Sequence, residues 1–418
     1  MTHFPRCQVE VSRKLGDTYA YRLLNSSEIY TCDAEIAKGV LENFPDKPDV
    51  YKTIAPLMGD NSVVIINGSQ WKEIRRELDK IIHKSKYESF LVAITKVGEE
   101  LVKTLRSHPK GVSIDINSLL VKTSMDIIAE TIFNDPMPTA LKDAMIELSK
   151  NVAELQFKPW LRLNPFFMSK FKNQKALIRN SFQNIINNRR QNQTQTQTQT
   201  QTHTQDIVNV LLNNGSFTDD LIIDQFISVF LAGHDTTAHS LSWVLYYISQ
   251  RPDIENRVRE LVNDVDINLN TVNNMEYLTW IIKETLRLNP SVANQGRQIT
   301  SDIKIGPYTF YKGNKVNISA LGLHLNENYW EDPYRFNPDR WRKNPINYSF
   351  LPFSAVHRIC LGKDFAMLEE KILIILLMKH FQFRTDNQRL IGPNSYLTTM
   401  PYRGLHMFVT PIKEPIHE

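Results

Sequence analysis

The feature of this sequence that most constrains its fold is a long helical pattern in the second half of the chain. Apolar residues recur at helical spacing from Leu221 to about Ser249, and Arg251 and Pro252 end the pattern. Just before it, Thr218 offers a capping hydroxyl, and two acids follow in the first turn. At 1.5 Å per residue the helix would be roughly 45 Å long. The pattern therefore predicts one helix that crosses a whole domain.

The middle of this helix consists of residues that suit a helix interior poorly. The sequence Leu-Ala-Gly-His-Asp-Thr-Thr begins at Leu231, and glycine, aspartate and threonine are each unfavourable in such a place. A local conflict of this kind is expected at functional sites. Ala232 and Gly233 leave room for a group bound against the helix, and Asp235 and Thr236 carry side chains that can relay protons.

A second unusual stretch contains a cysteine just before another apolar helical pattern. A lone cysteine such as Cys360 is ordinarily a small buried hydrophobe. Here Arg358 places a permanent cation two residues before the sulfur, and Gly362 opens an apolar run from Phe365 to Phe381. The free N–H groups and the positive dipole at a helix start both lower the pKa of a thiol. A thiolate in such a pocket suits a metal, and a single cysteine ligand suits haem iron.

Two further pairs of residues are spaced to share one face of a helix. Trp71 and Arg75 lie four residues apart, although a tryptophan that covers an amphipathic helix would give the same pattern. Glu284 and Arg287 lie three residues apart. Such a pair is ordinarily solvated and contributes little, but the apolar residues around this one favour partial burial.

The cysteine stretch resembles the ligand loop of the cytochrome P-450 (haem-thiolate monooxygenase) family, Phe-x-x-Gly-x-Arg-x-Cys-x-Gly. Phe353, Arg358, Cys360 and Gly362 match this pattern, and Val356 replaces its first glycine. The family's Ala-Gly-x-(Asp/Glu)-Thr-Thr, Glu-x-x-Arg and Pro-x-Arg elements also occur, in order with the cysteine loop and at compatible spacings. The segment of Trp71 and Arg75 is similar to the family's Trp-x-x-x-Arg helix. The resemblance covers essentially the whole chain from about residue 15.

The resemblance implies a role for each of these side chains. Cys360 would be the axial ligand of the haem iron, and Asp235 and Thr236 would be the catalytic pair that delivers protons. His324 falls where the family has either a haem-facing or a structural polar residue. The resemblance assigns haem contacts to Trp71, Arg75, Arg297, Phe353, Arg358 and Gly362, and a buried structural triad to Glu284, Arg287 and Arg340.

The implied fold is one mainly α-helical domain over residues 1–418 with a small β part. Haem b would lie between the long central helix and the helix after the cysteine loop. The implied function is a monooxygenase that inserts one oxygen atom of O2 into an apolar small-molecule or lipid-like substrate. Its electrons would come from NAD(P)H through an external reductase or a ferredoxin-type donor, since the chain has no flavin or iron–sulfur motif. Lys72, Arg76 and Lys363 could form part of a basic face for an acidic partner.

Two other functions stay open at this point. The first is an enzyme of the same fold that rearranges peroxides or dehydrates without external electrons. Such relatives often lack the acid–threonine pair, so Asp235 and Thr236 argue against it. The second is a non-catalytic haem-binding protein, which Val356 and the short N-terminus suggest. Family members usually carry an anchor or a first helix before the sheet, and both are expected to be missing here.

The first strands and helix are predicted by local pattern. Tyr19 to Leu24 and Ile29 to Cys32 look like two short strands, and Asp33 would cap a helix from Ala34 to Leu41.

Composition and charge exclude several classes of protein. A net charge of +4 gives no warrant for nucleic-acid binding. Three cysteines, Cys7, Cys32 and Cys360, are too few and too scattered for a disulfide scaffold or a zinc site. No stretch reaches the roughly 18 apolar residues that a membrane span needs. The expected location is therefore cytoplasmic or peripheral to a membrane.

Two segments have unusual composition. Phe157 to Phe171 interleaves large apolar residues with basic ones. It is either core or, as the resemblance favours, a lid over the substrate entrance that dips into a membrane surface. Gln191 to Gln205 is a glutamine–threonine repeat, which is too polar to offset its ordering entropy and is predicted to be a disordered surface loop.

Overall fold

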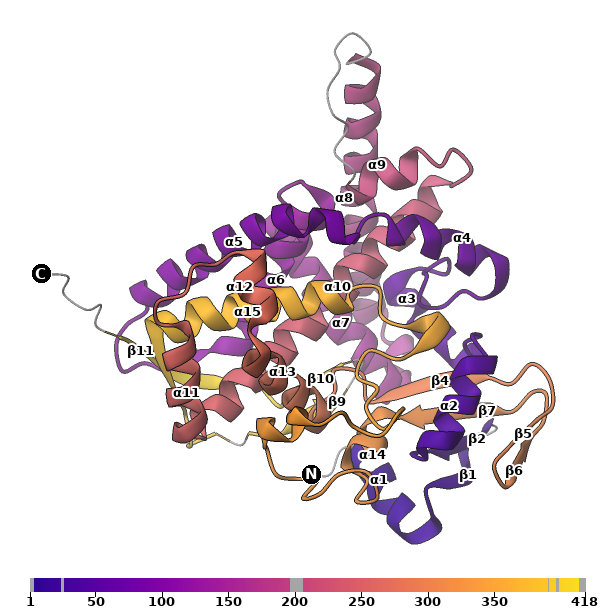
Figure 1. Ribbon diagram of the computed structural model, residues 1–418. Coiled ribbons are helices and arrows are strands. Elements are labelled where there is room, and N and C mark those ends of the chain that lie inside the picture. The colour runs from indigo at the N-terminus through magenta and orange to yellow at the C-terminus, as the bar shows by residue number, and fades with distance from the viewer. Residues whose placement is uncertain (1–3, 24–25, 196–205, 390, 396–397, 413–418) are drawn as a thin grey trace, which may run out of the picture. The chain divides into compact units, whose positions relative to one another are not determined.

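The computed structural model describes residues 4–23, 26–195, 206–389, 391–395 and 398–412. The chain divides into two compact units, each made of segments that are distant in sequence. Unit 1 comprises residues 1–48, 87–124 and 235–418, and unit 2 comprises residues 49–86 and 125–234. Both units are mainly helical, and the strands belong to unit 1 (Figure 1). This agrees with the mainly α-helical fold with a small β part that the resemblance implied.

Unit 1 is built around a helix that is buried along most of its length. Its helices are α1 (Phe4–Leu15), α2 (Ala34–Asn43), α5 (Tyr87–Ser107), α11 (Pro252–Val262), α12 (Leu269–Asn274), α13 (Glu276–Leu288), α14 (Ala320–Leu325) and α15 (Lys363–His380). Almost every residue of α15 from Phe365 onward is buried, as expected of a core helix. Helix α5 runs beside α15 (Figure 1). Gly98 of α5 permits this, because a Cβ there would lie 2.4 Å from Leu376 of α15.

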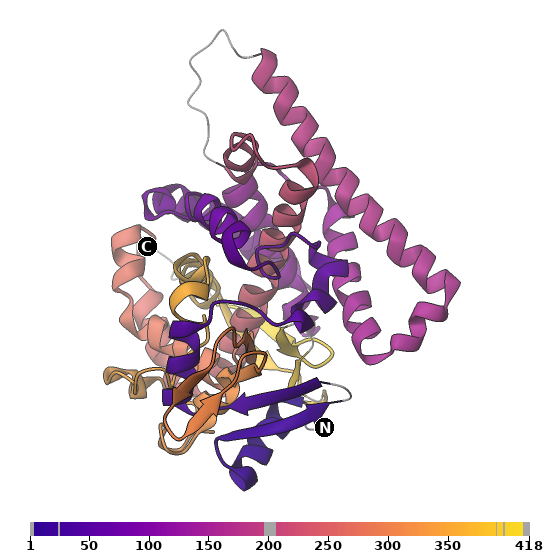
Figure 2. The same cartoon turned by 90° about the vertical axis from the view of Figure 1, so that its right-hand side faces the viewer.

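The sheets of unit 1 are small. One four-stranded sheet has the order β1 (Thr18–Leu23), β2 (Ser26–Thr31), β7 (Lys315–Ser319), β4 (Asn294–Gln298). Its β2–β7 pair is parallel and its other pairs are antiparallel. The remaining strands form β3 (Ile114–Asp115) with β11 (His406–Pro411) and β8 (Phe381–Thr385), and the pairs β5 (Ile303–Ile305) with β6 (Tyr308–Phe310) and β9 (Pro393–Ser395) with β10 (Thr399–Pro401). Figure 2 shows β1 and β2 as long neighbouring arrows.

Unit 2 packs its helices around a cluster of aromatic rings. Its helices are α3 (Ala55–Met58), α4 (Gly68–Asp79), α7 (Thr139–Phe157), α8 (Pro165–Gln195) and α9 (Ile207–Leu212). Phe133, Phe182, Phe226 and Phe230 pack with ring centroids 5.4 to 6.5 Å apart. Helix α8 lies beside α7 as a single long helix (Figure 2).

Helices α6 (Ile116–Ile128) and α10 (Asp219–Ser249) contain residues of both units. The predicted long helix is confirmed as α10, and the Thr218 hydroxyl accepts the N–H of Leu221 at 3.3 Å. Short 3-10 helices connect several elements: Asp49–Ile54, Lys84–Lys86, Pro159–Leu163, Pro338–Arg342 and Val356–Arg358. Residues Ala129–Phe133 continue α6 as one π-helical turn.

The N-terminal region differs from the sequence prediction in one respect. The two predicted strands are present as β1 and β2, and Asp33 caps α2 by accepting the N–H groups of Glu35 and Ile36. One helix, α1, precedes the first strand, where no helix was expected. Helix α8 continues to Gln195, into the segment that was expected to be a disordered loop, and residues 196–205 lie outside the described residues.

Candidate active site

The cysteine loop of unit 1 presents its thiol at the start of α15. The N–H of Cys360 donates to the carbonyl oxygen of Phe353 at 2.8 Å and closes the loop. Cys360 is exposed, and α15 begins three residues later, after Gly362. None of the three cysteines is in a disulfide. The thiol therefore lies near the positive end of a buried helix, where the thiolate form is favoured.

Two residues of this loop adopt the left-handed backbone conformation. Ser354 has φ 60° and Val356 has φ 53°. A β-branched residue is a strong outlier at positive φ because its Cβ crowds the backbone. Glycine would adopt this conformation without strain, so Val356 costs the loop roughly 1–3 kcal/mol. The resemblance predicted glycine at this position, and the backbone of the loop has the conformation that glycine favours.

Replacing Val356 by glycine is expected to stabilise the protein. Relief of the strained φ outweighs the loss of about 0.5–1 kcal/mol that a flexible glycine ordinarily causes. The melting temperature and the haem content of Val356→Gly, measured beside the parent, should both rise. Ala355→Gly is the matched control, because Ala355 has an extended backbone with φ −149° and has no strain to lose. A fall in both quantities for Val356→Gly would contradict the strain argument.

Basic side chains gather beside the loop. Arg358 donates from Nε to the carbonyl oxygen of Pro45 at 2.8 Å, and the buried Arg297 of β4 donates from Nη2 to the hydroxyl of Ser354 at 3.0 Å. Burial and the charges of Arg297 and Arg358 together hold the pKa of Lys47 well below its usual range. Lys47 was missed by the sequence analysis, because no motif or spacing connects it to two arginines in distant segments. The site thus concentrates positive charge, which favours bound carboxylates.

Helix α10 is mostly buried, but two residues in its middle are partly accessible to solvent. Asp235 and Thr236 are half-buried, whereas His234 and Thr237 on either side of them are buried. The hydroxyl of Ser291 donates to the carbonyl oxygen of Thr236 at 3.0 Å and fixes this turn. The side chains of Asp235 and Thr236 are therefore both partly accessible at the same turn of the helix.

One expectation for this stretch needs correction. Gly233 was expected to leave room for a bound group, but a Cβ at this position would lie 2.6 Å from Cδ1 of Ile128. The space beside Gly233 is thus filled by a side chain of α6, which would have to shift to admit a larger residue. Ala232, by contrast, is exposed.

Trp71 and Arg75 lie in unit 2, on α4. Trp71 is buried, and Arg75 donates from Nε to Asp79 at 3.0 Å. The structure therefore brings Arg297, Arg358 and the cysteine loop together within unit 1, whereas it places Trp71 and Arg75 in the other unit.

The structure also brings Glu284, Arg287 and Arg340 together. Glu284 accepts two hydrogen bonds from Arg287 at 2.9 and 3.0 Å and one from Arg340 at 2.9 Å. It also accepts the N–H of Asn337 at 2.9 Å and the indole N–H of Trp341 at 3.0 Å. Glu284 and Arg287 are fully buried. The carboxylate thus has the complete set of partners that a buried charge requires.

His324 connects this triad to the cysteine loop and has a structural role. Its Nδ1 lies 3.2 Å from the carbonyl oxygen of Arg287, and its Nε2 accepts the N–H of Leu351 at 2.9 Å. Nδ1 is therefore the protonated nitrogen, which donates to Arg287. Burial, together with the charge of Arg287, lowers the pKa of His324 to about 3. The neutral ring fixes the chain two residues before Phe353, so the haem-facing alternative is not supported.

The residues of unit 1 fit a bound haem. Gly362 has a negative φ, −88°, and a Cβ at this position would meet no atom within 4 Å. The backbone and the packing of the protein therefore do not require glycine there, whereas a flat group lying against the loop would. The exposed thiol suits the iron, and the basic side chains Lys47, Arg297 and Arg358 suit the two carboxylates of the porphyrin.

The segment with interleaved apolar and basic residues lies at the surface of unit 2. Trp160, Leu163 and Phe166 are 63%, 86% and 87% exposed, so the core alternative is wrong for them. Phe171 is buried, and the side chain of Phe157 lies outside the described residues.

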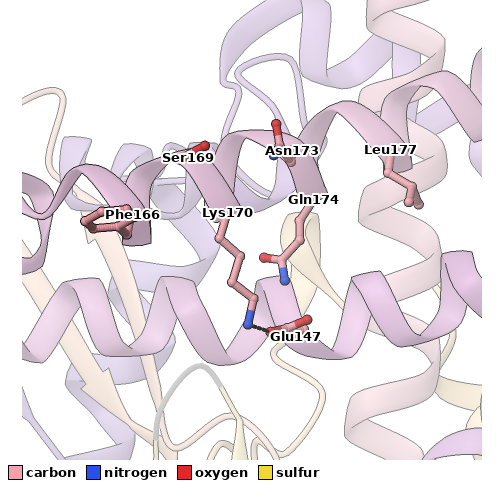
Figure 3. Close-up of a pocket in the computed structure, with 7 residues that line it drawn as sticks. All are labelled: Glu147, Phe166, Ser169, Lys170, Asn173, Gln174 and Leu177. Carbon is pink, nitrogen blue, oxygen red and sulfur yellow. Dashed lines mark ion pairs between the residues drawn. The ribbon is translucent and has the colours of Figure 1, made fainter.

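Beside this segment is an open groove of about 460 Å³ between α7 and α8. Figure 3 shows Phe166 and Leu177 toward its ends, with Lys170 paired to Glu147 between them.

Among the described residues, no helix combines the length and the apolar character that crossing a bilayer requires.

Comparison with known proteins gives a consistent result. The family model described as Cytochrome P450 matches residues 2–408. Cytochrome P450 4c21 of Blattella germanica is 28% identical over 392 residues, which cover 85% of this chain and 78% of the relative. Cytochrome P450 4V2 of Homo sapiens is 26% identical over 399 residues, covering 86% and 75% of the two chains. Cytochrome P450 4F8 of Homo sapiens is 27% identical over 401 residues, covering 86% and 76%.

Proposed function

Since the chain belongs to the cytochrome P450 family, we propose that Cys360 is the thiolate ligand of its haem iron. The protein is a haem-thiolate monooxygenase that inserts one oxygen atom of O2 into an apolar, lipid-like substrate. It uses haem b and takes NAD(P)H-derived electrons from a partner. The observation that carries the ligand assignment is the position of Cys360, an exposed thiol just before the start of α15, in a loop that its own N–H closes.

When bound, the haem supplies the activation of O2 at its iron, and the protein supplies position, charge and protons. The N-terminus of α15 stabilises the thiolate of Cys360, because the unpaired N–H groups there favour negative charge. Phe353, whose carbonyl oxygen accepts the N–H of Cys360, would cover the sulfur, which is exposed in this structure, once haem is bound.

The second part of the proposal concerns cofactor binding. Arg297, which donates to Ser354 of the loop, and Arg358, which donates to Pro45, bind the carboxylates of the porphyrin. The resemblance assigns haem contacts to Trp71 and Arg75 of α4 as well. Arginine suits this task because its planar group donates two parallel hydrogen bonds to one carboxylate. Lys47 joins them, since a bound anion relieves the repulsion that lowers the pKa of its ammonium group.

The third part concerns protons. With haem bound, the Thr236 hydroxyl would donate its own proton to the oxygen that reacts and would be reprotonated from solvent, with Asp235 as the acid that takes up the replacing proton. Support comes from their half-buried position in the middle of α10. A hydroxyl is suited to this relay because it both accepts and donates a hydrogen bond.

The fourth part concerns location and partner. We place the protein at a membrane surface, with Trp160, Leu163 and Phe166 in contact with lipid, because aromatic residues flanked by basic ones favour the interface. The electron donor meets a basic surface that includes the exposed Lys363. Burial, together with the nearby charge of Lys363, lowers the pKa of Lys283, so the two basic side chains lie near each other. An acidic partner would be attracted to them.

A spectroscopic experiment tests the ligand assignment. The reduced parent protein with carbon monoxide should show the strongly red-shifted Soret band of a thiolate-ligated haem, and Cys360→Ser should lose that band because a serine hydroxyl does not replace the thiolate. Cys7→Ser and Cys32→Ser are the matched controls and should keep it. A parent-like band from Cys360→Ser would refute the assignment of Cys360 as the axial ligand.

A further inference from the structure

The first half of α10 holds the segment that leads into α4, and it does so with side chains. Between α3 and α4 the chain passes through residues 59–67 (Figure 1). The buried amide of Gln225 accepts the N–H of Val63 at 2.9 Å and donates to the carbonyl oxygen of Asn61 at 2.7 Å. A single side chain thus pairs with the backbone on both its donor and its acceptor side, as a neighbouring strand would.

The adjacent residue of α10 holds the same segment with a charge. Asp224 is buried and accepts the backbone N–H of Asn61 at 3.1 Å and its side-chain amide at 3.0 Å. Arg179 of α8 donates to the same carboxylate at 2.7 Å and compensates its charge. Gly59 has φ +84°, and a Cβ there would lie 2.1 Å from the Asp224 carboxylate. The backbone therefore lies directly against the acid, and glycine is required for this approach.

A third polar side chain lies one turn further along α10. The hydroxyl of Ser228 lies 2.6 Å from the hydroxyl of Ser62. Ser62 in turn accepts the N–H groups of Ile65 and Ile66 on its carbonyl oxygen, at 2.8 and 3.0 Å. These bonds form a compact turn that ends just before Asn67, the residue that precedes α4. The turn that Ser62 closes thus leads directly into the residue that precedes α4.

We propose that Asp224, Gln225 and Ser228, here named the α10 latch, are positioning residues that set the place of α4 and, through it, of Trp71 and Arg75. This inference rests on the proposed function, in which Trp71 and Arg75 bind the haem carboxylates. Residues that orient the side chains in contact with a ligand control the affinity for that ligand without touching it.

The energetic reason for the latch is that polar side chains inside an apolar helix are costly unless they are paired. Each latch residue is buried, and each finds its partner in the segment before α4. Breaking one bond leaves a backbone group or a charge without its partner. The segment then shifts, and α4 shifts with it, whereas the remainder of unit 2 is held by its aromatic cluster.

The test compares haem loss with thermal stability in the haem-loaded protein. Gln225→Leu is expected to release haem to apomyoglobin roughly ten-fold faster than the parent or more, as for other residues that orient the ligands of a site. The control is Asn151→Leu, which breaks another half-buried hydrogen bond of unit 2, from Asn151 to Gln174 at 2.7 Å, far in sequence from α4. Asn151→Leu should lose haem at the same rate as the parent, even if its melting temperature falls as much as that of Gln225→Leu.

Graded variants separate positioning from general destabilisation. Asp224→Asn keeps an oxygen for the N–H of Asn61 and should lose haem more slowly than Asp224→Ala. Ser228→Ala is the mild variant that keeps the test valid if Gln225→Leu does not fold. The proposal is overturned if latch variants and Asn151→Leu release haem at the same rate for the same loss of melting temperature.

One further variant distinguishes this inference from the proposed function on which it rests. Arg75→Leu removes a proposed carboxylate partner directly and should also accelerate haem loss. If Arg75→Leu accelerates haem loss and Gln225→Leu does not, the latch proposal fails and the role of Arg75 stands. If neither variant changes haem loss, both the role of Arg75 and the latch proposal are wrong.

Discussion

Glu284→Gln should lower the free energy of unfolding by about 3–5 kcal/mol, the usual cost of removing one partner from a buried charged pair. Glu284 accepts five hydrogen bonds, two from Arg287 and one each from Arg340, Asn337 and Trp341. A glutamine has the same shape but no charge, so the fully buried guanidinium of Arg287 is left uncompensated. The amide also presents N–H groups where only acceptors fit.

The effect should be read from denaturant unfolding of the haem-loaded protein, beside a control that removes the same charge at the surface. Glu327→Gln breaks the exposed ion pair of Glu327 with Arg13, and such pairs contribute less than about 1 kcal/mol. Retention of haem should follow the stability of Glu284→Gln, because the triad is linked to the cysteine loop by His324. A loss below about 1 kcal/mol in Glu284→Gln would show that the triad is not a structural requirement.

The second large effect concerns the pH dependence of stability, which two buried acids of α15 should control. Glu369 lies against Ser124 of α6, and Glu370 lies 3.1 Å from Ser240 of α10. Burial raises the pKa of Glu369 to about 8, even though the hydrogen bond from Ser124 acts in the opposite direction. Burial, with the neighbouring charge of Glu369, raises the pKa of Glu370 well above its usual range, against the hydrogen bond from Ser240. Both groups are therefore neutral acids in the folded protein at pH 7.

The direction of this pH dependence follows from how many protons the folded and the unfolded states bind. An unfolded glutamate titrates near pH 4.3, whereas the folded state keeps a proton on Glu369 up to about pH 8. Between these values the folded state binds more protons than the unfolded state, so stability falls as pH rises. Each such group contributes a slope of about 1.4 kcal/mol per pH unit in this interval.

Glu369→Gln should remove this slope. The neutral amide keeps an oxygen for the Ser124 hydroxyl and has no proton to lose, so the variant should match the parent near pH 5. It should become more stable than the parent as pH rises toward 8. Unfolding free energies of both proteins from pH 5 to 8 measure the difference, and Glu260→Gln, which changes an exposed carboxyl of α11, is the control. Parallel curves for Glu369→Gln and the parent would mean that Glu369 is already ionised in the folded protein.

Local patterns predicted the elements that depend on neighbours in sequence. The run of apolar residues and the Thr218 cap were sufficient for α10, and the apolar run after Gly362 was sufficient for α15. Spacing alone placed Glu284 and Arg287 on one face of α13. In each case the information lies within a few helical turns, so the sequence carries it directly.

Composition could not decide between a buried and an exposed segment. Core and surface lid were both compatible with the apolar and basic residues around Trp160, and the structure exposes Trp160 and Phe166 while it buries Phe171. Helix α1 was missed for a related reason, since its short pattern has no cap or motif to mark it. Whether an amphipathic segment is covered depends on which other segments reach it.

The sequence by itself determined the family motifs, the central helices and the candidate ligand Cys360. Only the tertiary structure decided the left-handed backbone at Val356, the neutral acids Glu369 and Glu370, the position of Lys47 beside two arginines, and the α10 latch. For the acids, Lys47 and the latch the physical reason is the same. Burial and the distances between charges arise from segments that are more than a hundred residues apart along the chain, and no periodicity in a single sequence encodes which of them will meet. The strain at Val356 is a backbone conformation of its own loop, which side-chain periodicity does not encode either.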